Sequence, residues 1–511
     1  MTKHYDANRV RRSLAHFLTG KAFTAVSTLL VLFLLARALP KADYAILVVF
    51  EAMVALTGMA ASFGINQTLL RFVPELRAAN NGLALYRLIR NALLSRAWVF
   101  GLALVGLAVA GPWLAGWLGF GKRTELLPWY LFAGWANLMW LLLAQVMESL
   151  LWQKTSQYTI AATAALRLIL LGVSYVRGEA DLVRVVMIEI ICHSLTLGLL
   201  MLGLWRSQRR DPHRNEGSLG WFGDNSGRIS RYALSGYGFA LSALLYGSQP
   251  NRAISARFLP PQAMGDYGFA DSLANFFRRF LPSTLLQGFI RPLYFVRYAE
   301  TKQLHYLERM ANLIFRVNLV LMSTAALILL FFGKVVLDAL TAGKYGDTVY
   351  LVAAMLGLLV LESLRFQHIL LCHTLERNGL LIYSNLILSG ALLVALPLLP
   401  VIGAWGIVLA NLTGNFLAIA FIRIRLASAG QAFGLDFPLI LRALVCFALA
   451  EGAGFLAQEM SGLIAGGMVA IATWLLLVTL VRPFSREEVT QLRGWLRRRQ
   501  SHVPQMEGGS P

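Results

Sequence analysis

The stretch ARALP at residues 36–40, followed by DYA at 43–45, returns later in the chain as ARFLP at 256–260 with DYG at 266–268. Each copy follows a long run of mostly apolar residues. A loop repeated at the same point of two hydrophobic blocks indicates a duplicated helical unit. In membrane proteins, duplicated helix bundles commonly surround a central site and expose it to the two sides of the membrane in turn.

The composition is typical of a protein that resides in a lipid bilayer. Hydrophobic residues make up 57% of the 511 residues, and charged residues only 14%. Soluble domains average about 25% charged residues, so this inventory cannot cover a water-facing surface. Many apolar runs approach the ~20 residues that cross a bilayer core, and the alternating pattern of a transmembrane barrel is missing. We therefore predict an all-α polytopic membrane protein.

About 14 transmembrane helices are predicted, as two six-helix lobes that repeat one another and two further C-terminal helices. The predicted spans are approximately 15–38, 44–66, 92–118, 126–151, 157–176, 183–205, 232–255, 267–290, 313–337, 348–372, 380–399, 401–422, 440–458 and 461–481. The domains that follow are an N-terminal lobe at 1–205, a cytoplasmic linker at 206–231, a C-terminal lobe at 232–430, spans thirteen and fourteen at 431–481, and a basic cytoplasmic tail at 482–511.

The basic residues predict the orientation in the membrane. The formal net charge is +20. With the amino terminus inside, the inner segments hold about 31 basic residues and the outer loops about nine, as the positive-inside rule requires. We therefore expect a multi-pass protein of the cell inner membrane with both termini in the cytoplasm. This bias explains most of the positive charge, so we expect anionic membrane lipids rather than nucleic acid as its partner.

Motifs of enzymes and metal sites are missing from the sequence. It contains no G-x-x-x-x-G-K-[ST], no H-E-x-x-H and no G-x-S-x-G, the signatures of nucleotide, zinc and serine-hydrolase sites. The cysteines Cys192, Cys372 and Cys446 lie far apart in apolar segments, which favours neither a disulfide nor a metal site. We predict no catalytic residue, no metal and no cofactor.

Several cations fall inside predicted spans, where the positive-inside rule does not explain them. An ionised side chain at the bilayer centre costs about 2.5–3.5 kcal/mol, so such residues tend to face a bundle interior or a water-filled cavity. Arginine and lysine bind phosphate through charge-assisted hydrogen bonds that strengthen where water is excluded. We predict a cationic cavity that binds an anionic substrate such as a lipid pyrophosphate, lined by Lys21, Arg278, Arg279, Arg167 and Arg252.

Acidic residues in the same spans leave other interpretations open. Glu51, Asp271 and Glu362 can pair with these cations as part of the packing, or they can bind a coupling ion. Arg252, near a predicted helix end, can instead extend to the membrane interface. His193 is interpreted as a packed neutral histidine rather than part of a proton relay.

Short motifs occur in the same order along nearly the whole chain. Besides the repeated loop, they are FGINQ at 63–67, which runs into RFVPE at 71–75, and IGAWGIVLA at 402–410. With these motifs and fourteen predicted spans, the chain resembles the polysaccharide transporter (Wzx-like flippase) branch of the multidrug/oligosaccharidyl-lipid/polysaccharide flippase superfamily.

The resemblance implies a transporter that flips a polyprenyl-pyrophosphate-linked oligosaccharide across the bacterial inner membrane, for cell-surface or exopolysaccharide synthesis. It implies alternating access between two lobes, driven by an H⁺ or Na⁺ gradient. Drug antiporters of the same superfamily bind cations through acidic cavity residues, and Glu51 with Asp271 keeps that alternative open. A further alternative is a non-transporting subunit that scaffolds a polysaccharide polymerase or synthase complex through its basic inner loops.

Overall fold

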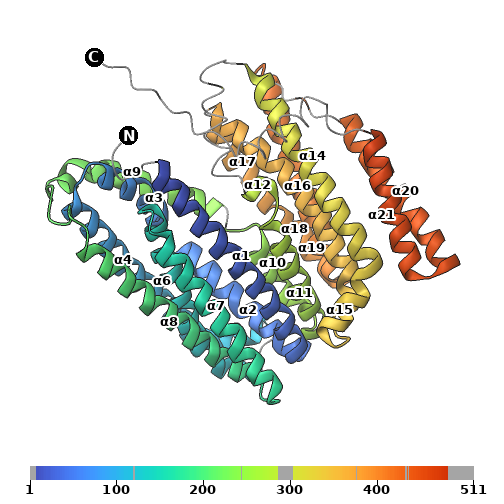
Figure 1. The fold of residues 1–511 in the computed structure, drawn as a ribbon, viewed down its shortest axis with the longest axis horizontal. Coiled ribbons are helices and arrows are strands. Elements are labelled where there is room, and N and C mark those ends of the chain that lie inside the picture. The colour runs from blue at the N-terminus through green and yellow to red at the C-terminus, as the bar shows by residue number, and fades with distance from the viewer. Residues whose placement is uncertain are drawn as a thin grey trace. The chain divides into compact units, whose positions relative to one another are not determined.

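In the computed structural model, the chain folds into a set of long α-helices (Figure 1). The structure describes residues 7–118, 121–242, 244–285, 298, 303–375, 377–431, 434 and 437–481. Within these residues there is no strand, and twelve helical segments are long and apolar enough to cross a membrane. The predicted fold class, an all-α polytopic membrane protein, is thereby confirmed.

The helices follow one another in this order: α1 (Ala7–Ala38), α2 (Lys41–Ala60), α3 (Ile65–Ala78), α4 (Gly82–Val109), α5 (Gly111–Leu118), η2 (Gly121–Leu126), α6 (Leu127–Ser149), α7 (Gln153–Val176), α8 (Leu182–Arg209), α9 (Trp221–Ser242), α10 (Ser248–Phe258), α11 (Pro261–Arg278), α12 (Pro282–Leu285), α14 (Leu304–Ile328), η3 (Leu329–Gly333), α15 (Lys334–Thr341), η4 (Gly346–Thr348), α16 (Val349–Thr374), α17 (Asn378–Ser389), α18 (Ala391–Ile402), α19 (Ala404–Ser428), α20 (Phe437–Ser461) and α21 (Leu463–Val481). Most are α-helices, while η2 and η4 are 3₁₀-helices and η3 is a π-helix.

The chain divides into two compact units. The first comprises Met1–Phe277, Lys334–Met355 and Leu381–Ala418. The second comprises Arg278–Gly333, Leu356–Leu380 and Ile419–Pro511. Each unit is a body of its own, and the contacts described below lie within one or the other.

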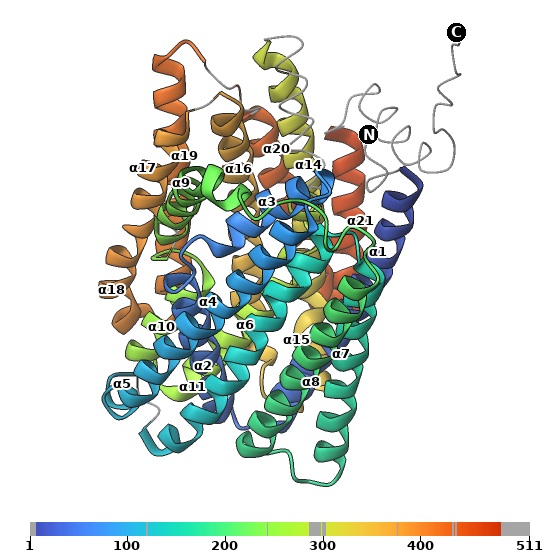
Figure 2. The same cartoon turned by 90° about the vertical axis from the view of Figure 1, so that its left-hand side faces the viewer.

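Small residues let the helices of the first unit pack closely. In this unit α1 lies beside α7, and α8 packs against both α6 and α7 (Figure 2). A Cβ added to Gly134 of α6 would lie 2.5 Å from a methyl carbon of Val54 on α2, and one added to Gly58 of α2 would lie 2.4 Å from Leu138 of α6. Lipid tails are as apolar as the side chains, so such van der Waals fit is what holds membrane helices together.

The two copies of the repeated loop have the same local structure. Pro40 follows α1 and Pro260 follows α10. The Pro40 carbonyl accepts the first hydrogen bond of α2 from the Tyr44 N–H at 2.9 Å, and the Pro260 carbonyl accepts that of α11 from the Met264 N–H at 2.9 Å. Proline lacks an N–H, so it interrupts one helix while its fixed φ suits the start of the next.

Predicted spans seven and eight, at 232–255 and 267–290, are not the continuous helices we expected. The first is broken, because α9 ends at Ser242 and α10 begins only after Gly247, whose φ of 102° no helix can contain. The second stops where α11 ends at Arg278, and residues 286–290 lie outside the described ranges. Irregular backbone inside a membrane is tolerated where it is buried in protein or lines a cavity.

The predicted linker at 206–231 is shorter in the structure. α8 continues to Arg209 and α9 starts at Trp221, although the start of α9 is rich in glycine, asparagine and serine. The loop between them is fixed to α4: the Tyr86 hydroxyl donates to Asp211 at 2.6 Å. The predicted tail at 482–511 lies outside the described residues.

In the second unit, α20 and α21 form a hairpin that packs against the end of α14 and η3. A Cβ added to Gly466 would lie 2.7 Å from the Gly454 carbonyl oxygen, and one added to Gly467 would lie 2.2 Å from the Phe332 ring. The Trp474 indole is buried and donates to the Thr324 hydroxyl at 2.9 Å. Close glycine contacts therefore join the last two spans to the bundle.

The break between α2 and α3 generates the first prediction. Gly64 has a φ of 71°, and a Cβ added there would lie 2.0 Å from the Ala233 carbonyl oxygen of α9. Gly64→Ala should lower the free energy of unfolding by more than the about 1–2 kcal/mol that a left-handed backbone costs, since the methyl group also displaces α9. Thermal unfolding of the purified protein in detergent measures this.

The control is Gly106→Ala in the middle of α4, where a Cβ would meet nothing within 4 Å. Alanine favours a helix over glycine by about 1 kcal/mol, so this variant should unfold at the same temperature or higher. Equal losses of stability in both variants would contradict the close packing at Gly64.

Candidate functional site

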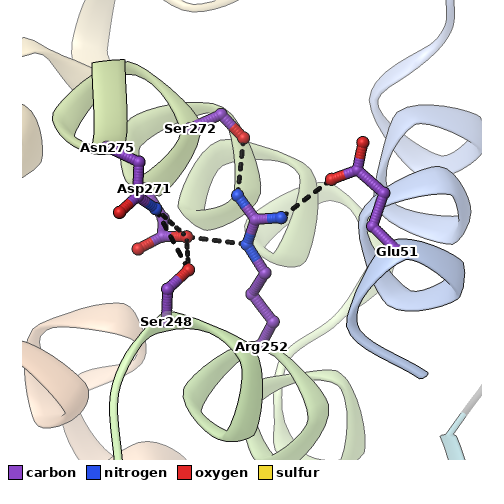
Figure 3. Close-up of polar contacts among 6 residues, drawn as sticks. All are labelled: Glu51, Ser248, Arg252, Asp271, Ser272 and Asn275. Atoms are coloured by element: carbon purple, nitrogen blue, oxygen red, sulfur yellow. Dashed lines mark hydrogen bonds and ion pairs between the residues drawn. The ribbon is translucent and has the colours of Figure 1, made fainter. Parts of the chain in front are cut away.

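Arg252 of α10 occupies the centre of a buried polar network in the first unit. The residue is 3% exposed. Its Nε donates to Asp271 of α11 at 2.6 Å, one Nη to Glu51 of α2 at 2.9 Å and the other to the Ser272 hydroxyl at 2.7 Å (Figure 3). The guanidinium therefore joins three helices that come from both predicted lobes.

The two carboxylates that hold Arg252 differ in their surroundings. Asp271 also accepts from the Ser248 hydroxyl and, at 3.1 Å, from the Asn275 amide, and its side chain is only 11% exposed. Glu51 has Arg252 as its ion-pair partner, and its side chain is 44% exposed. Asp271 is thus a fixed counter-ion, whereas Glu51 is the member of the network that solvent or an ion can reach.

The helix break at Gly247 determines where the side chains of this network lie. Ser248 is the first residue of α10, so its hydroxyl lies at the helix start, and Arg252 follows one turn later on the same side. Both side chains then face Asp271 of α11 (Figure 3). A continuous seventh span would turn this face elsewhere, so the break in the chain builds the site.

A second ion pair lies in the same unit, between α7 and α8. Arg167 Nε donates to a Glu189 carboxylate oxygen at 2.8 Å, and the other oxygen lies 3.0 Å from His193 Nε2. The Trp140 indole donates to His193 Nδ1 at 3.2 Å. With Nδ1 accepting, a neutral imidazole carries its proton on Nε2 and donates it to Glu189, which agrees with the interpretation of His193 as a packed neutral residue.

These two clusters act on one another electrostatically. Glu51 interacts with Arg167 as well as with Arg252, and the buried Tyr130 of α6 interacts with both arginines. Two arginines face three carboxylates, so the formal charge is −1 when all are ionised and His193 is neutral. Tertiary packing therefore places carboxylates beside Arg167 and Arg252, so these five side chains together carry no net positive charge.

Lys21 has a different environment. It lies on α1 inside the candidate span Thr19–Ala38, and its side chain is exposed. Its ammonium lies 5.3 Å from the centre of the Phe17 ring and acts electrostatically on Glu148 of α6, whose carboxylate accepts from the Gln157 amide at 2.7 Å. Within the described parts of the chain, Lys21 forms no ion pair.

The adjacent arginines of the second unit are split between two roles. Arg278 ends α11 and its guanidinium lies 2.9 Å from Glu362 of α16. Arg279 lies in the turn that follows, is exposed, and forms no ion pair with any residue that the structure describes. Both were expected midway through a span, but they mark a helix end. Adjacent residues at a helix end point in different directions, so Glu362 neutralises Arg278 and not Arg279.

Arg96 of α4 is a buried cation that the sequence analysis missed. It is 4% exposed, and its two Nη atoms donate to the backbone carbonyls of Ala61 at 2.6 Å and Gly58 at 2.7 Å. These carbonyls belong to the C-terminal end of α2, where a positive charge is favourable. The sequence feature that could have predicted this role is that Arg96 lies within an apolar run that contains no acidic residue.

The fold is similar to that of solved structures, among them a transporter. An inward-facing MATE family multidrug transporter of the MOP superfamily matches with a TM-score of 0.61 and 12% identity, over 80% of this chain and 96% of its own. A structure described as protein A matches with a TM-score of 0.57 and 15% identity, over 85% and 98%. No protein-family model matches the sequence, and no curated protein does.

At these identities the likeness shows the fold, which is that of the MATE-like transporters of the MOP superfamily. The superfamily named for that solved structure is the multidrug/oligosaccharidyl-lipid/polysaccharide superfamily, whose polysaccharide branch the sequence motifs resemble. The fold is compatible with its drug-transporting and its polysaccharide-transporting branches alike.

The network around Arg252 generates the second prediction. Arg252→Met leaves Glu51 and Asp271 without their shared cation, and breaking a buried ion pair in this way costs about 3–5 kcal/mol. The double variant Arg252→Met/Asp271→Asn should recover much of that loss, because the buried carboxylate is removed as well. Unfolding in mixed micelles gives the three free energies.

Arg184→Met serves as the control, since Arg184 pairs with Glu179 at 2.5 Å but both side chains are about half exposed. Such surface pairs contribute about 0–1 kcal/mol. A double variant no more stable than Arg252→Met alone would argue against a charge network at this position.

Proposed function

We propose that this protein flips a lipid-linked oligosaccharide, joined to its polyprenyl carrier through pyrophosphate, across the inner membrane by alternating access between two lobes. The observation that carries the proposal is Lys21. It is a cation within a membrane span whose side chain is exposed and has no carboxylate bonded to it among the described residues. A charge persists in such a place where a water-filled cavity or an anionic ligand meets it.

The position of Lys21 suits the first encounter with such a substrate. It lies at the start of the apolar part of α1, the end predicted to face the cytoplasm, and Glu148 and Gln157 lie near it at the matching ends of α6 and α7. A lipid-linked precursor made on the inner leaflet would present its pyrophosphate at this depth. Ammonium and guanidinium groups bind phosphate oxygens through charge-assisted hydrogen bonds.

The second unit contributes a further cation, Arg279, which forms no ion pair among the described residues and lies beside the paired Arg278. The MATE-like fold supports transport, and the motifs at 63–67 and 402–410 resemble those of polysaccharide transporters. The proposal extends to both termini in the cytoplasm, to anionic lipids along the basic inner loops, and to polymerase or synthase subunits that receive the glycan.

Glu51 is proposed as the residue that couples transport to an H⁺ or Na⁺ gradient. Its carboxylate is partly exposed, bonds Arg252 and acts on Arg167. A proton or Na⁺ on Glu51 would cancel its charge and weaken its hold on Arg252, which ties α10 to α2. Binding an ion would therefore change how strongly the two predicted lobes are joined.

A cation-coupled drug antiporter is the second candidate function. It is favoured by the formal charge of −1 among Glu51, Asp271, Glu189, Arg167 and Arg252, because acidic residues in a membrane cavity attract cations. Purified protein in vesicles separates the two functions: a flippase moves a labelled lipid-linked oligosaccharide, and an antiporter moves a fluorescent cationic dye against a pH or sodium gradient.

The third prediction concerns Lys21→Ala. The variant should fold normally, since the side chain is exposed, but flip a labelled lipid-linked oligosaccharide at least about tenfold more slowly, because a charge-assisted hydrogen bond contributes about 1.5–3 kcal/mol. Arg278→Ala/Arg279→Ala should show a similar loss. The assay measures protection of the glycan from an external lectin in reconstituted vesicles.

Lys154→Ala on α7 is the matched control, because Lys154 is also an exposed lysine near the predicted inner side. It should retain the wild-type rate. Wild-type flipping by both Lys21→Ala and the double arginine variant would overturn the proposed substrate site.

The fourth prediction tests coupling. Glu51→Gln keeps the shape of the side chain but cannot release a proton or bind Na⁺ as a carboxylate. Transport by this variant should no longer respond when an inward H⁺ or Na⁺ gradient is imposed on the vesicles, whereas Glu179→Gln in an exposed loop pair should respond as the wild type does. A full response of Glu51→Gln would assign the coupling to another residue.

A further inference from the structure

Lys344 links two helices of the first unit that belong to different predicted lobes. It lies in the turn after α15, and its ammonium donates to the Arg37 carbonyl at 2.7 Å and the Leu39 carbonyl at 2.9 Å. These carbonyls lie at the C-terminal end of α1. The last carbonyls of a helix lack partners within it and carry partial negative charge, so a cation binds them favourably.

Arg37 makes the reverse connection. One of its Nη atoms donates at 2.8 Å to the carbonyl of Ala339, which lies in the last turn of α15, and its Nε donates at 2.8 Å to the Tyr175 hydroxyl of α7. Lys344, which follows α15, therefore caps α1, and Arg37, near the end of α1, caps α15. The two interactions form or break together when α1 and α15 separate.

The two copies of the repeated loop also meet here. Lys41, the first residue of α2, lies 2.6 Å from Asp266 of α11. The Lys41 ammonium also lies 5.2 Å from the centre of the buried Tyr345 ring, which packs against Phe269 at 4.5 Å. Burial raises the pKa of the Asp266 carboxyl, although Lys41 lowers it, which indicates that the pair is partly removed from water.

We propose that Arg37, Lys41, Asp266 and Lys344, here called the latch, are positioning residues of the transport cycle that hold the two repeats together while this end is closed. α1, α2 and α7 belong to the predicted N-terminal lobe, and α11 and α15 to the C-terminal lobe. Any movement that separates the lobes at this end has to break the contacts between Lys41 and Asp266, between Lys344 and the end of α1, and between Arg37 and the Ala339 carbonyl. The inference rests on the proposed function in one respect, namely that the lobes separate at this end. In the predicted orientation, this end of the helices faces the outside.

Cross-linking tests the latch. In a variant without the native cysteines, Lys41→Cys/Asp266→Cys should be bridged by a short bis-methanethiosulfonate reagent, and the bridge should abolish transport until a reductant is added. Arg184→Cys/Glu179→Cys is the matched control, because that ion pair lies within one predicted lobe at the same end. It should be bridged equally well without affecting transport.

A charge variant tests the helix caps separately. Lys344→Met removes the ammonium that bonds the end of α1, and it should lower the bridged fraction of Lys41→Cys/Asp266→Cys severalfold by favouring the open state. Lys334→Met is its control, since Lys334 pairs with Asp347 at 2.6 Å on the same predicted lobe, and it should leave the bridged fraction unchanged.

Failure of the cysteine pair to be bridged, equal bridging in the Lys344→Met and Lys334→Met backgrounds, or full transport by bridged protein would each overturn the latch. The bridged fraction is measured without any substrate. If wild-type protein moves no lipid-linked oligosaccharide, the proposed function fails, and the difference between the two lysine variants still decides the latch.

Discussion

A charge inside a lipid bilayer has to be met by an opposite charge, by the end of a helix, or by water. The structure uses the first two solutions for four of the cations described above. Arg252, Arg167 and Arg278 each bond a carboxylate, and Arg96 bonds the final carbonyls of α2. Lys21 lies within a candidate membrane span and no described carboxylate bonds it, and for that reason it carries the proposed contact with an anionic substrate.

The same requirement explains why the irregular parts of the chain lie where they do. The α9–α10 break frees Ser248 and Arg252 to face Asp271, and the α2–α3 break exposes carbonyls that Arg96 caps. At both breaks a side chain thus bonds groups of a neighbouring helix. In membrane transporters, interrupted helices commonly form the substrate site, because continuous helices leave fewer ways for the bundle to rearrange around it.

The sequence predicted the fold class because hydrophobicity and length alone decide which segments cross a membrane. It also predicted the repeated loop, since proline imposes the same local structure at Pro40 and Pro260. Spans seven and eight were mispredicted, because windows of mostly apolar residues conceal the break before α10 at Gly247 and the end of α11 at Arg278. Arg96 was overlooked because its partners are backbone atoms, which leave no trace in a sequence.

By itself, then, the sequence determined a helical membrane protein with a repeated loop, and which charges lie in its apolar segments, while the two lobes and the orientation remain predictions. Only the tertiary structure decided which of those charges are neutralised. Glu51 and Arg252 bond although 201 residues separate them, and Arg167 finds Glu189 on the next helix. The hydrophobicity of a segment indicates whether lipid or water surrounds it. Ion pairs depend on which helix faces come together, and helix packing decides this.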